Sequence, residues 1–254
     1  MKQIDQLNKN IILSLTDRKD FSVSVYSVLP STNDLAKDLA KKGAKENTVI
    51  IAERQTAGRG RTGKSFFSPE DSGVYLSVIL KPDVLPTEAY KITISAAVAA
   101  VMALKEIGVQ ADIKWVNDIF LGGKKVAGIL TEASFSKNKL DFAVLGLGIN
   151  FYPPIDGFPK DIELSAGYLF SKPAENRKNK FVAAFLNNFT DFSSEILSEY
   201  KRHCFILGKT VFVGDRKIPA KALDISERAE LLVEYENGEK AFLNSGEISI
   251  KPIN

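Results

Sequence analysis

The chain has 254 residues, 44% of them hydrophobic and 26% charged, enough for one large globular domain or a domain with a small companion. A net charge of +3, from 34 basic and 31 acidic side chains, excludes a surface built throughout to bind a polyanion, so nucleic acid would bind only locally. One cysteine excludes an internal disulfide, and no secretory signal is visible, so we predict a cytoplasmic protein. The longest apolar stretch, Ile92 to Leu104, is too short to span a bilayer.

The N-terminal part predicts an arm, a strand and a helix. Residues 1–20 are polar apart from one apolar cluster and indicate an arm or short helix. Phe21–Val28 alternates with the period of a strand. A helix then begins at a natural N-cap, Ser31 or Thr32, and stops at Gly43. Spacing alone favours capping for these hydroxyls, although such a helix N-terminus could also bind the polar edge of a ligand.

A basic, glycine-rich segment follows, between the predicted strands Val49–Ala52 and Gly73–Leu80. From Arg54 to Pro69 it has no acid, and its cations and inner glycines are Arg54, Arg59, Arg61, Lys64, Gly58, Gly60 and Gly63. Glycine lets backbone N–H groups approach a ligand, and arginine forks match carboxylate and phosphate oxygens. The segment is therefore expected to be a loop that binds a small anion, or two in succession.

Other interpretations of this loop have to be weighed. Gly58–Ser65 satisfies the P-loop pattern G-x-x-x-x-G-K-[ST], which needs a helix starting at its end. The residues that follow favour a turn, so we interpret the match as accidental. Nucleic-acid-binding Arg-Gly segments usually recur in disordered tracts, and one copy in a globular chain fits them weakly. A solvated surface loop without a ligand is the remaining alternative.

The middle of the chain predicts a buried helix and the start of a second group of strands. Pro86–Gly108 is rich in alanine and is expected to pack closely on a sheet. A strand runs from Asp112 to near Val116, and Asn117 and Asp118 sit where it turns.

A predicted hairpin comes next, formed by Lys124–Phe135 and Leu140–Asn150. Side chains alternate between the faces of a strand, so the residues that share one face can be named. They are Gly128 and Glu132 on the first strand, and Gly146, Gly148 and Asn150 on the second. Glycines weaken a strand but leave room for a ligand to lie flat on the backbone, whereas a bulge or tight packing is the alternative explanation.

The C-terminal third predicts helices and then short strands. Glu163–Phe170 is expected to be a short helix, and Glu175 to about Phe205 a longer one that ends before Gly208. Its apolar stripe is interpreted as core. His203 and Cys204, the only histidine and the only cysteine, are interpreted as structural residues. The stripe is Phe181, Phe185, Phe189, Phe192, Ile196 and Tyr200. The predicted strands are Thr210–Val213, Ile218–Ile225, Ala229–Tyr235, Lys240–Leu243 and Glu247–Lys251, which together suggest a small barrel.

Four groups of residues stand out in order along the chain: Ser31–Asn33, Gly58–Lys64, Lys114–Asp118 with Lys125–Glu132, and Gly146–Asn150. Together they resemble the biotin protein ligases, over roughly residues 21–254. The G-R-G-R-x-G loop, the K-W-x-N-D segment and the G-x-G-I-N segment are very specific jointly, and moderately so one by one.

The resemblance implies an α+β fold over residues 1–207, with a mixed sheet flanked by helices. This is the catalytic domain of biotin and lipoate ligases, similar to that of class II aminoacyl-tRNA synthetases. Residues 208–254 would form a small C-terminal SH3-like β-barrel. The implied reaction joins the biotin carboxylate to the α-phosphate of ATP, giving biotinyl-5′-AMP, and then passes biotin to a lysine of a biotin carboxyl carrier protein.

The resemblance also implies a role for particular residues. Those implied for biotin are Ser31, Thr32, Asn33, Gln55, Gly58, Arg59, Gly60, Arg61, Lys125, Gly128, Ile129, Gly146 and Gly148. Those implied for the nucleotide are Lys64, Phe66, Asn117, Asp118 and Asn150. Lys125, Arg59 and Arg61 would be catalytic, and Asp118 would hold Mg²⁺. The chemistry agrees independently, because a carboxylate and a phosphate repel as they approach and cations can neutralise both.

The sequence departs from the family pattern at three positions. Val116 replaces a proline, and Phe66 stands where some members have tryptophan. Lys64 stands where arginine is commoner, so the bidentate guanidinium is lost but the charge is kept. None of these changes removes a reacting group. The helix-turn-helix of the ligase-repressors does not precede the match, so we expect no DNA binding, and the sequence allows a monomer or a homodimer.

Two rival functions stay open. A lipoate or octanoate protein ligase would share the fold, and the Arg-Gly loop and the Ser31–Asn33 segment favour biotin over it. A non-catalytic module that binds biotin or single-stranded nucleic acid would use the same loop without chemistry.

Overall fold

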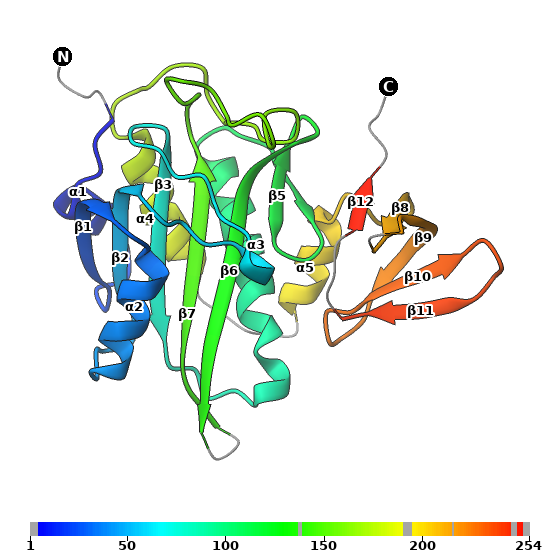
Figure 1. Cartoon of the computed structure of the whole chain (residues 1–254). Helices are drawn as coiled ribbons and strands as arrows, with labels where there is room; N and C mark the ends of the chain where they lie inside the picture. The colour runs from blue at the N-terminus through cyan, green and yellow to red at the C-terminus, as the bar shows by residue number, and fades with distance from the viewer. Residues whose placement is uncertain (1–4, 137–138, 190–194, 215, 245–247, 251–254) are drawn as a thin grey trace.

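The computed structural model describes residues 5–136, 139–189, 195–214, 216–244 and 248–250. Its larger part is a sheet that, within these ranges, has seven strands in the order β1-β2-β3-β7-β6-β5-β4 (Figure 1). The strands are β1 (Ser22–Leu29), β2 (Thr48–Gln55), β3 (Gly73–Leu80), β4 (Asp112–Lys114), β5 (Asp118–Leu121), β6 (Lys124–Ser136) and β7 (Lys139–Asn150). Only β1 and β2 pair in parallel among them, so the sheet is mixed, as predicted.

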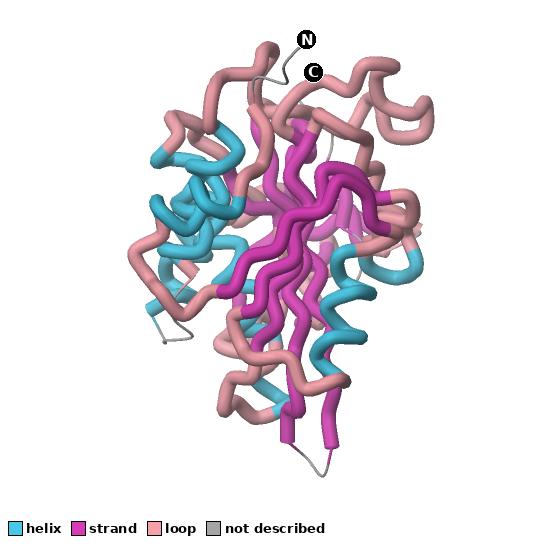
Figure 2. Tube along the Cα trace, turned by 90° about the vertical axis from the view of Figure 1, so that its left-hand side faces the viewer, coloured by secondary structure: helices cyan, strands magenta, loops and turns pink. Residues whose placement is uncertain are grey.

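Helices cover both faces of this sheet (Figure 2). The helices of the described residues are α1 (Lys9–Leu15), α2 (Thr32–Lys41), α3 (Tyr90–Glu106), α4 (Arg177–Asn188) and α5 (Glu195–His203). Helix α2 packs on one face against β2, β3 and β7, while α3 lies on the other face with α4 and α5 against it. The alanines of α3 are buried and allow it to lie close to the sheet, which confirms the predicted helix apart from its first turn. That turn, Pro86–Glu88, is a separate 3₁₀ helix.

The alternation of side chains divides the core into two layers. Ile50, Ile79 and Val144 face α2, whereas Ile51, Val78 and Leu145 belong to the larger core around α3. Because both faces of β3 are covered, all eight of its residues are buried. The central strands are thereby fixed, and they provide a rigid base for the loops at their ends.

Two helix predictions are wrong. The segment predicted as a helix at Glu163–Phe170 forms turns instead, because its backbone pairs with the edge of β6: Lys125 N donates to Ser165 O over 2.8 Å, and Gly167 N donates to Lys125 O over 2.8 Å. The long helix predicted from Glu175 ends at Asn188, and α5 resumes at Glu195.

The aromatic stripe on these two helices is core, as predicted. Phe181, Phe185 and Phe189 are buried and stack in succession, and Tyr200 is fully buried. Ile196 packs at the edge of the core, and Phe192 lies outside the described residues.

A second, antiparallel sheet follows, in the order β11-β10-β9-β8-β12 among the described residues. Its strands are β8 (Thr210–Val213), β9 (Ile218–Ile225), β10 (Leu231–Tyr235), β11 (Lys240–Leu243) and β12 (Ile248–Ile250). Three of them have the predicted bounds, and the predicted ends of the last, 247 and 251, lie outside the described residues. The sheet fits a small SH3-like domain.

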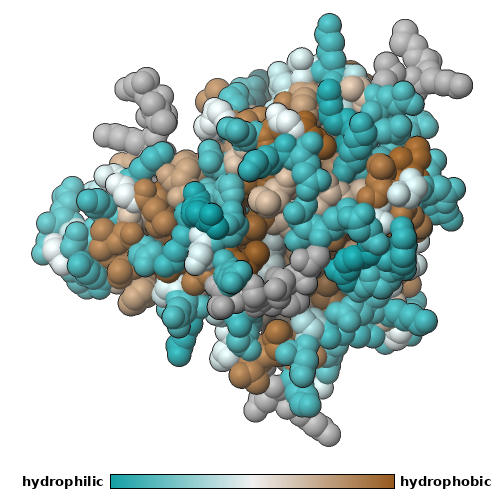
Figure 3. Space-filling view, turned by 180° about the vertical axis from the view of Figure 1, so that it is seen from behind, coloured by the Kyte–Doolittle hydropathy of each residue, from teal (hydrophilic) through white to brown (hydrophobic). Residues whose placement is uncertain are grey.

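The second sheet is joined to the first by polar contacts. Trp115 Nε1 donates to Ala229 O over 2.8 Å, and the Tyr90 hydroxyl donates to the carbonyl of Glu227. Seen from behind, the surface is mainly hydrophilic, with apolar side chains in separate patches (Figure 3). Within the described residues, no helix is both long and apolar enough to cross a membrane.

Candidate active site

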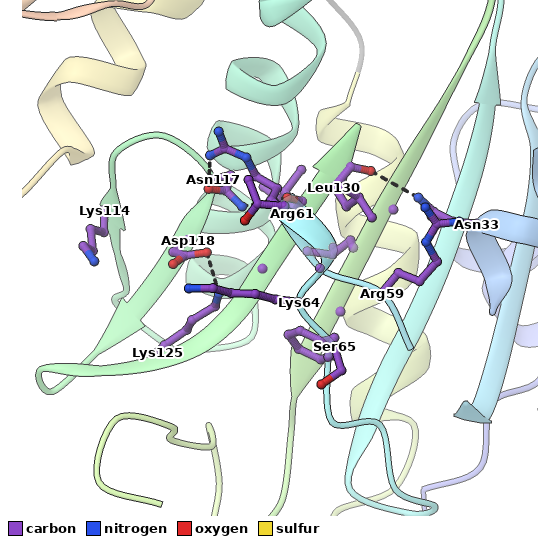
Figure 4. Close-up of a pocket in the computed structure, with 18 of the residues that line it drawn as sticks. Asn33, Arg59, Arg61, Lys64, Ser65, Lys114, Asn117, Asp118, Lys125 and Leu130 are labelled. Atoms are coloured by element: carbon purple, nitrogen blue, oxygen red, sulfur yellow. Dashed lines mark hydrogen bonds and ion pairs between the residues drawn. The ribbon is translucent and has the colours of Figure 1, made fainter. Parts of the chain in front are cut away.

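A cavity of about 760 Å³ lies between the loop that joins β2 to β3 and the face of the sheet formed by β3, β7, β6 and β5 (Figure 4). We call residues 56–72 the basic loop. The structure brings together at this cavity nearly all the residues predicted from the sequence. They are Ser31, Thr32, Asn33, Gln55, Arg59, Gly60, Arg61, Lys64, Phe66, Asn117, Asp118, Lys125, Gly128, Ile129, Gly146 and Gly148. Gly58 and Asn150 do not line it.

Three glycines form the floor of the cavity. Gly128 lies opposite Gly148 across the β6–β7 pair, and Gly146 lies opposite Leu130. A Cβ at Gly146 would overlap the Asn33 amide, and one at Gly148 would lie 2.6 Å from the Phe66 ring. The shared face predicted from strand parity is therefore a strip of bare backbone, on which the Asn33 amide and the Phe66 ring can lie only because these side chains are missing.

One end of the cavity is a buried hydrogen-bonding cluster at the start of α2. Ser31 caps the helix by accepting from Asp34 N, as its sequence position predicts. Gln55 Oε1 accepts from Thr32 N over 2.8 Å and from Thr32 Oγ1 over 3.1 Å. Gln55 Nε2 donates to Ser68 Oγ over 3.0 Å, so the cluster is tied to the far leg of the basic loop.

Asn33 is held in this cluster by two groups that the sequence did not single out for this role. Its Nδ2 donates to Glu132 Oε2 over 2.9 Å. Ser77 Oγ, on the buried strand β3, lies 2.6 Å from Asn33 Oδ1 and 2.8 Å from Thr32 Oγ1, and its proton can serve either. A serine inside the apolar run of β3 is the only signal in the sequence that could have identified Ser77.

The basic loop folds back on itself. Gly60 N donates to Lys64 O over 2.7 Å, and Phe66 N donates to Gly58 O over 2.9 Å. Thr62 and Gly63 make the turn in the left-handed region, at φ values of 52° and 77°. No helix starts at the end of the G-x-x-x-x-G-K-S match, so the P-loop interpretation is excluded. Gly58 packs inside the loop, where a Cβ would lie 2.6 Å from Ser68 Oγ.

Arg59 points to the hydrogen-bonding end of the cavity, beside Asn33 (Figure 4). Its guanidinium pairs with Asp34 Oδ1 at 2.5 Å and with Glu132 Oε1 at 3.0 Å. Lys37 pairs with the same two carboxylates at 3.0 Å each. Burial alone would raise the pKa of Asp34, but hydrogen bonds from Lys37 and Arg59 outweigh it and lower that pKa. Arg59 therefore fastens the basic loop to α2 and β6.

Arg61 lies across the middle of the cavity. Its Nη1 donates to Asn117 Oδ1 over 2.8 Å. Asn117 is itself fixed to β6, since its Nδ2 donates to Ile129 O over 2.8 Å and its carbonyl accepts from Ile129 N over 2.9 Å. Arg61 of the basic loop is thereby linked to β6 through Asn117.

The opposite end of the cavity is cationic. Lys64, Lys114 and Lys125 line it around one carboxylate, Asp118, whose Oδ1 lies 2.6 Å from Lys125 Nζ. Burial lowers the pKa of Lys114, the neighbouring lysines Lys125 and Lys64 lower it further, and Asp118 only partly opposes them. Lys114 stands in the K-W-x-N-D segment but was not predicted as a site residue. The excess positive charge fits a polyanionic ligand such as the phosphates of a nucleotide.

The side chains at the cationic end fit a magnesium ion that is also coordinated by phosphate oxygens of a ligand. No group of three His, Cys, Asp or Glu side chains in the described residues could hold a metal alone. Asp118 Oδ1 is buried, and the Lys125 ammonium lies 2.6 Å from it. Mg²⁺ in proteins commonly takes one or two carboxylates and completes its shell with phosphate oxygens and water. Asp118 could supply the carboxylate.

Two residues predicted for the nucleotide lie in unlike places. The Phe66 ring lies over Gly148 and meets Tyr75 edge to face, with centroids 6.3 Å apart. Asn150 is buried outside the cavity, where its Nδ2 donates to Gly167 O over 2.9 Å. In this structure the Asn150 side chain therefore supports the segment after β7.

Comparisons with known proteins agree with this site. Residues 25–150 match the model of the biotin/lipoate A/B protein ligase family. The bifunctional ligase/repressor BirA of Bacillus subtilis is 34% identical over 227 residues, which cover 85% of this chain and 70% of that protein. A biotin–[acetyl-CoA-carboxylase] ligase of Mycobacterium tuberculosis is 26% identical over 243 residues, covering 89% of this chain and 88% of the relative.

A solved structure extends the similarity to the fold. The biotin protein ligase of Aquifex aeolicus, in complex with biotin and ATP, superposes with a TM-score of 0.70 at 27% identity, covering 90% of this chain and 97% of that chain. Most of the residues on which the sequence resemblance depends line one cavity. The chain therefore belongs to the biotin/lipoate A/B protein ligase family.

Proposed function

We infer that the chain is an ATP-dependent biotin protein ligase, which makes biotinyl-5′-AMP from biotin and ATP and then transfers biotin to a lysine of a biotin carboxyl carrier protein. One observation carries the inference: a single cavity has a hydrogen-bonding end and a cationic end, joined by a floor of glycines. Such a cavity suits a ligand with a polar head, a thin middle and a carboxylate that must meet a phosphate.

The hydrogen-bonding end favours biotin over lipoate. Thr32, Asn33 and Ser77 bring buried oxygen atoms together there, and the first two line the cavity. The ureido ring of biotin has N–H donors and a carbonyl acceptor that can form hydrogen bonds with such groups, whereas the dithiolane ring of lipoate has neither. A site built to hydrogen-bond a substrate discriminates strongly against an analogue that leaves its polar groups unpaired.

The cationic end suits the first half-reaction. A carboxylate oxygen of biotin forms a bond to the α-phosphorus of ATP, the bond to the β-phosphate bridging oxygen breaks, and pyrophosphate leaves. We assign Arg61 and Lys125 to the carboxylate and α-phosphate, and Lys64 and Lys114 to the leaving phosphates, because these cations line the cavity from three different segments. When bound, Mg²⁺ would neutralise phosphate charge beside Asp118.

The second half-reaction uses the same positions. The amine of a carrier lysine attacks the carbonyl carbon of the mixed anhydride, AMP leaves with the bonding electron pair, and the amine loses a proton. Lys125 would stabilise the negative charge that develops on oxygen in both steps. The basic loop would shelter the intermediate from water until the amine arrives.

Several finer assignments belong to the same proposal. Phe66 would stack on the adenine after leaving the glycine floor, while Asn117 and Asp118 would serve the nucleotide. We likewise propose that the second domain begins at residue 208 and that the protein is cytoplasmic. The proposed partner is the carrier protein of acetyl-CoA carboxylase or a similar enzyme, by analogy with the Mycobacterium tuberculosis ligase. Arg59 would reach the biotin carboxylate only after exchanging one of its partners, Asp34 or Glu132.

The function is tested by incubating the protein with ATP, Mg²⁺, biotin and a biotin carboxyl carrier domain, and measuring the mass of the carrier lysine. We expect one biotinyl group on one lysine. A parallel thermal-shift series with biotin and lipoate separates the rival ligase, because a ligand raises the unfolding midpoint according to its excess over Kd. Stabilisation by lipoate alone would support a lipoate ligase instead.

Replacing Arg61 with alanine is expected to slow adenylate formation and to shorten retention of biotinyl-5′-AMP, by about ten- to a hundredfold. The Arg61 side chain is not buried and donates a hydrogen bond to Asn117, so the unfolding midpoint should stay within a few degrees. Single-turnover kinetics with labelled biotin give the two rates. Wild-type adenylation by this variant would remove Arg61 from the mechanism.

Replacing Ser77 with alanine is expected to weaken biotin binding by about tenfold, because Asn33 Oδ1 loses a close hydrogen-bond donor. The KM for ATP should change little, since Ser77 lies at the hydrogen-bonding end. Calorimetric titration with biotin, and initial rates against ATP, measure the two effects. An equal change in both constants would indicate a general packing defect at β3.

A further inference from the structure

A buried lysine outside the cavity is the least expected charged group in the structure. Lys178 lies in the first turn of α4, and its side chain is only 2% exposed. Its ammonium donates to Asp71 O over 3.2 Å, lies 3.9 Å from Glu53 Oε2 and lies 5.6 Å from the centroid of the Tyr152 ring. Fully buried lysines are rare, and a buried ion pair is seldom a net gain in stability over apolar side chains.

The two oxygen partners of this ammonium stand at opposite ends of the basic loop. Glu53 is on β2, shortly before the chain leaves the sheet, and Asp71 lies just before β3 begins. One side chain of α4 thus bridges the strand that enters the loop and the last leg of the loop. The last leg is held further by Tyr75, whose hydroxyl donates to Pro69 O over 3.0 Å.

The N-terminal arm closes this cluster from outside. Glu53 Oε1 accepts from Leu7 N over 2.9 Å. The Asp5 carboxylate accepts from Lys178 N, with both oxygens at 3.1 Å, and from the Tyr152 hydroxyl at 2.5 Å. Asp5 thereby caps α4, where the N-cap residue Asn176 makes no side-chain cap of its own. The arm, α4, β2 and the last leg of the loop form one connected unit.

We propose that Lys178 is a positioning residue for the basic loop, which fastens the last leg of the loop at Asp71 to Glu53 of β2 so that Arg61 and Lys64 stay over the cavity. Burial lowers the pKa of Lys178 and raises that of Glu53, which is the electrostatic cost of placing both groups there. An apolar side chain would avoid that cost but could not join Asp71 of the loop to Glu53 of β2. The proposal rests on the proposed function only in the experiment that measures retention of biotinyl-5′-AMP.

The first test is cleavage of the ligand-free protein by an arginine-specific protease, in which the fragments that end at Arg59 and Arg61 are measured separately from cuts at the other arginines. We expect Lys178→Met to be cut about tenfold faster in the loop, because cleavage follows the population of open loop. Lys180→Met, an exposed lysine of the same helix, is the matched control and should be cut at the wild-type rate. Lys178→Arg keeps a cation and should restore most of the protection of the loop, which is read from the fragments that end at Arg59 and Arg61, apart from any cut at the arginine that this change adds.

The second test separates positioning from stability. Lys178→Met alone leaves Glu53 without its cation, so the double variant with Glu53→Gln should regain much of any lost thermal stability and still be cut quickly. Released biotinyl-5′-AMP in single-turnover experiments should rise by about ten- to a hundredfold in both variants, as expected for a misplaced loop.

Wild-type loop cleavage by a folded Lys178→Met or double variant would overturn the proposal, and so would failure of both to fold, since Lys178 would then be a structural residue. A wild-type protein that makes no adenylate would instead overturn the proposed function. In that event the protease result with ligand-free protein still decides the role of Lys178.

Discussion

Alanine at Lys125 should slow both half-reactions by about 10² to 10³, the usual cost of removing one fixed group that stabilises developing negative charge. The ammonium lies at the cationic end of the cavity, 2.6 Å from Asp118 Oδ1 and directly beside Gly128. No other lysine of β6 lines the cavity. Adenylate formation and transfer from pre-formed biotinyl-5′-AMP, measured separately, give the two effects.

The matched control is Lys124→Ala, at the exposed neighbouring position of the same strand. It should leave both rates unchanged. If Lys125→Ala lowers only the unfolding midpoint, with rates per folded molecule intact, then the pair with Asp118 is structural and the catalytic assignment is wrong.

Alanine at Gly146 should weaken biotin binding by about a hundredfold, or about 2.7 kcal/mol. The added Cβ would overlap the Asn33 amide, which cannot move away freely because Ser77 and Glu132 hold both of its polar atoms. The methyl group would also fill part of the flat floor. Calorimetric titration with biotin measures the change.

Gly148→Ala serves as the comparison, on the same strand and the same face. Its Cβ would meet the Phe66 ring, which belongs to the basic loop and can swing away, so the loss of affinity should be smaller. If biotin bound the folded Gly146→Ala protein as tightly as wild type, the glycine floor would not be where biotin lies.

Much of this site could be predicted because local sequence patterns determine it. Strand parity placed Gly128, Gly146 and Gly148 on one face, and pairing of β6 with β7 then brought them together. The cap at Ser31 follows from the residue type before a helical pattern. The resemblance placed four distant segments at one cavity, which periodicity alone could not do.

What could not be predicted depends on contacts between distant segments. Arg59 pairs with Asp34 and Glu132, residues 25 and 73 positions away, and no local pattern shows this. The helix expected at Glu163–Phe170 fails because the edge of β6 competes for its backbone hydrogen bonds. Lys178 looks like an ordinary surface residue of an amphipathic helix until the N-terminal arm is seen to cover it.

The central claim is that one cavity joins the carboxylate of biotin to the α-phosphate of ATP, and biotin-dependent exchange of labelled pyrophosphate into ATP tests it most directly. Exchange reports reversal of adenylate formation and needs no carrier protein. We predict exchange that requires biotin and Mg²⁺, is not supported by lipoate, and falls in the Lys125→Ala and Gly146→Ala variants. No exchange at saturating biotin, or exchange with lipoate instead, would contradict the account.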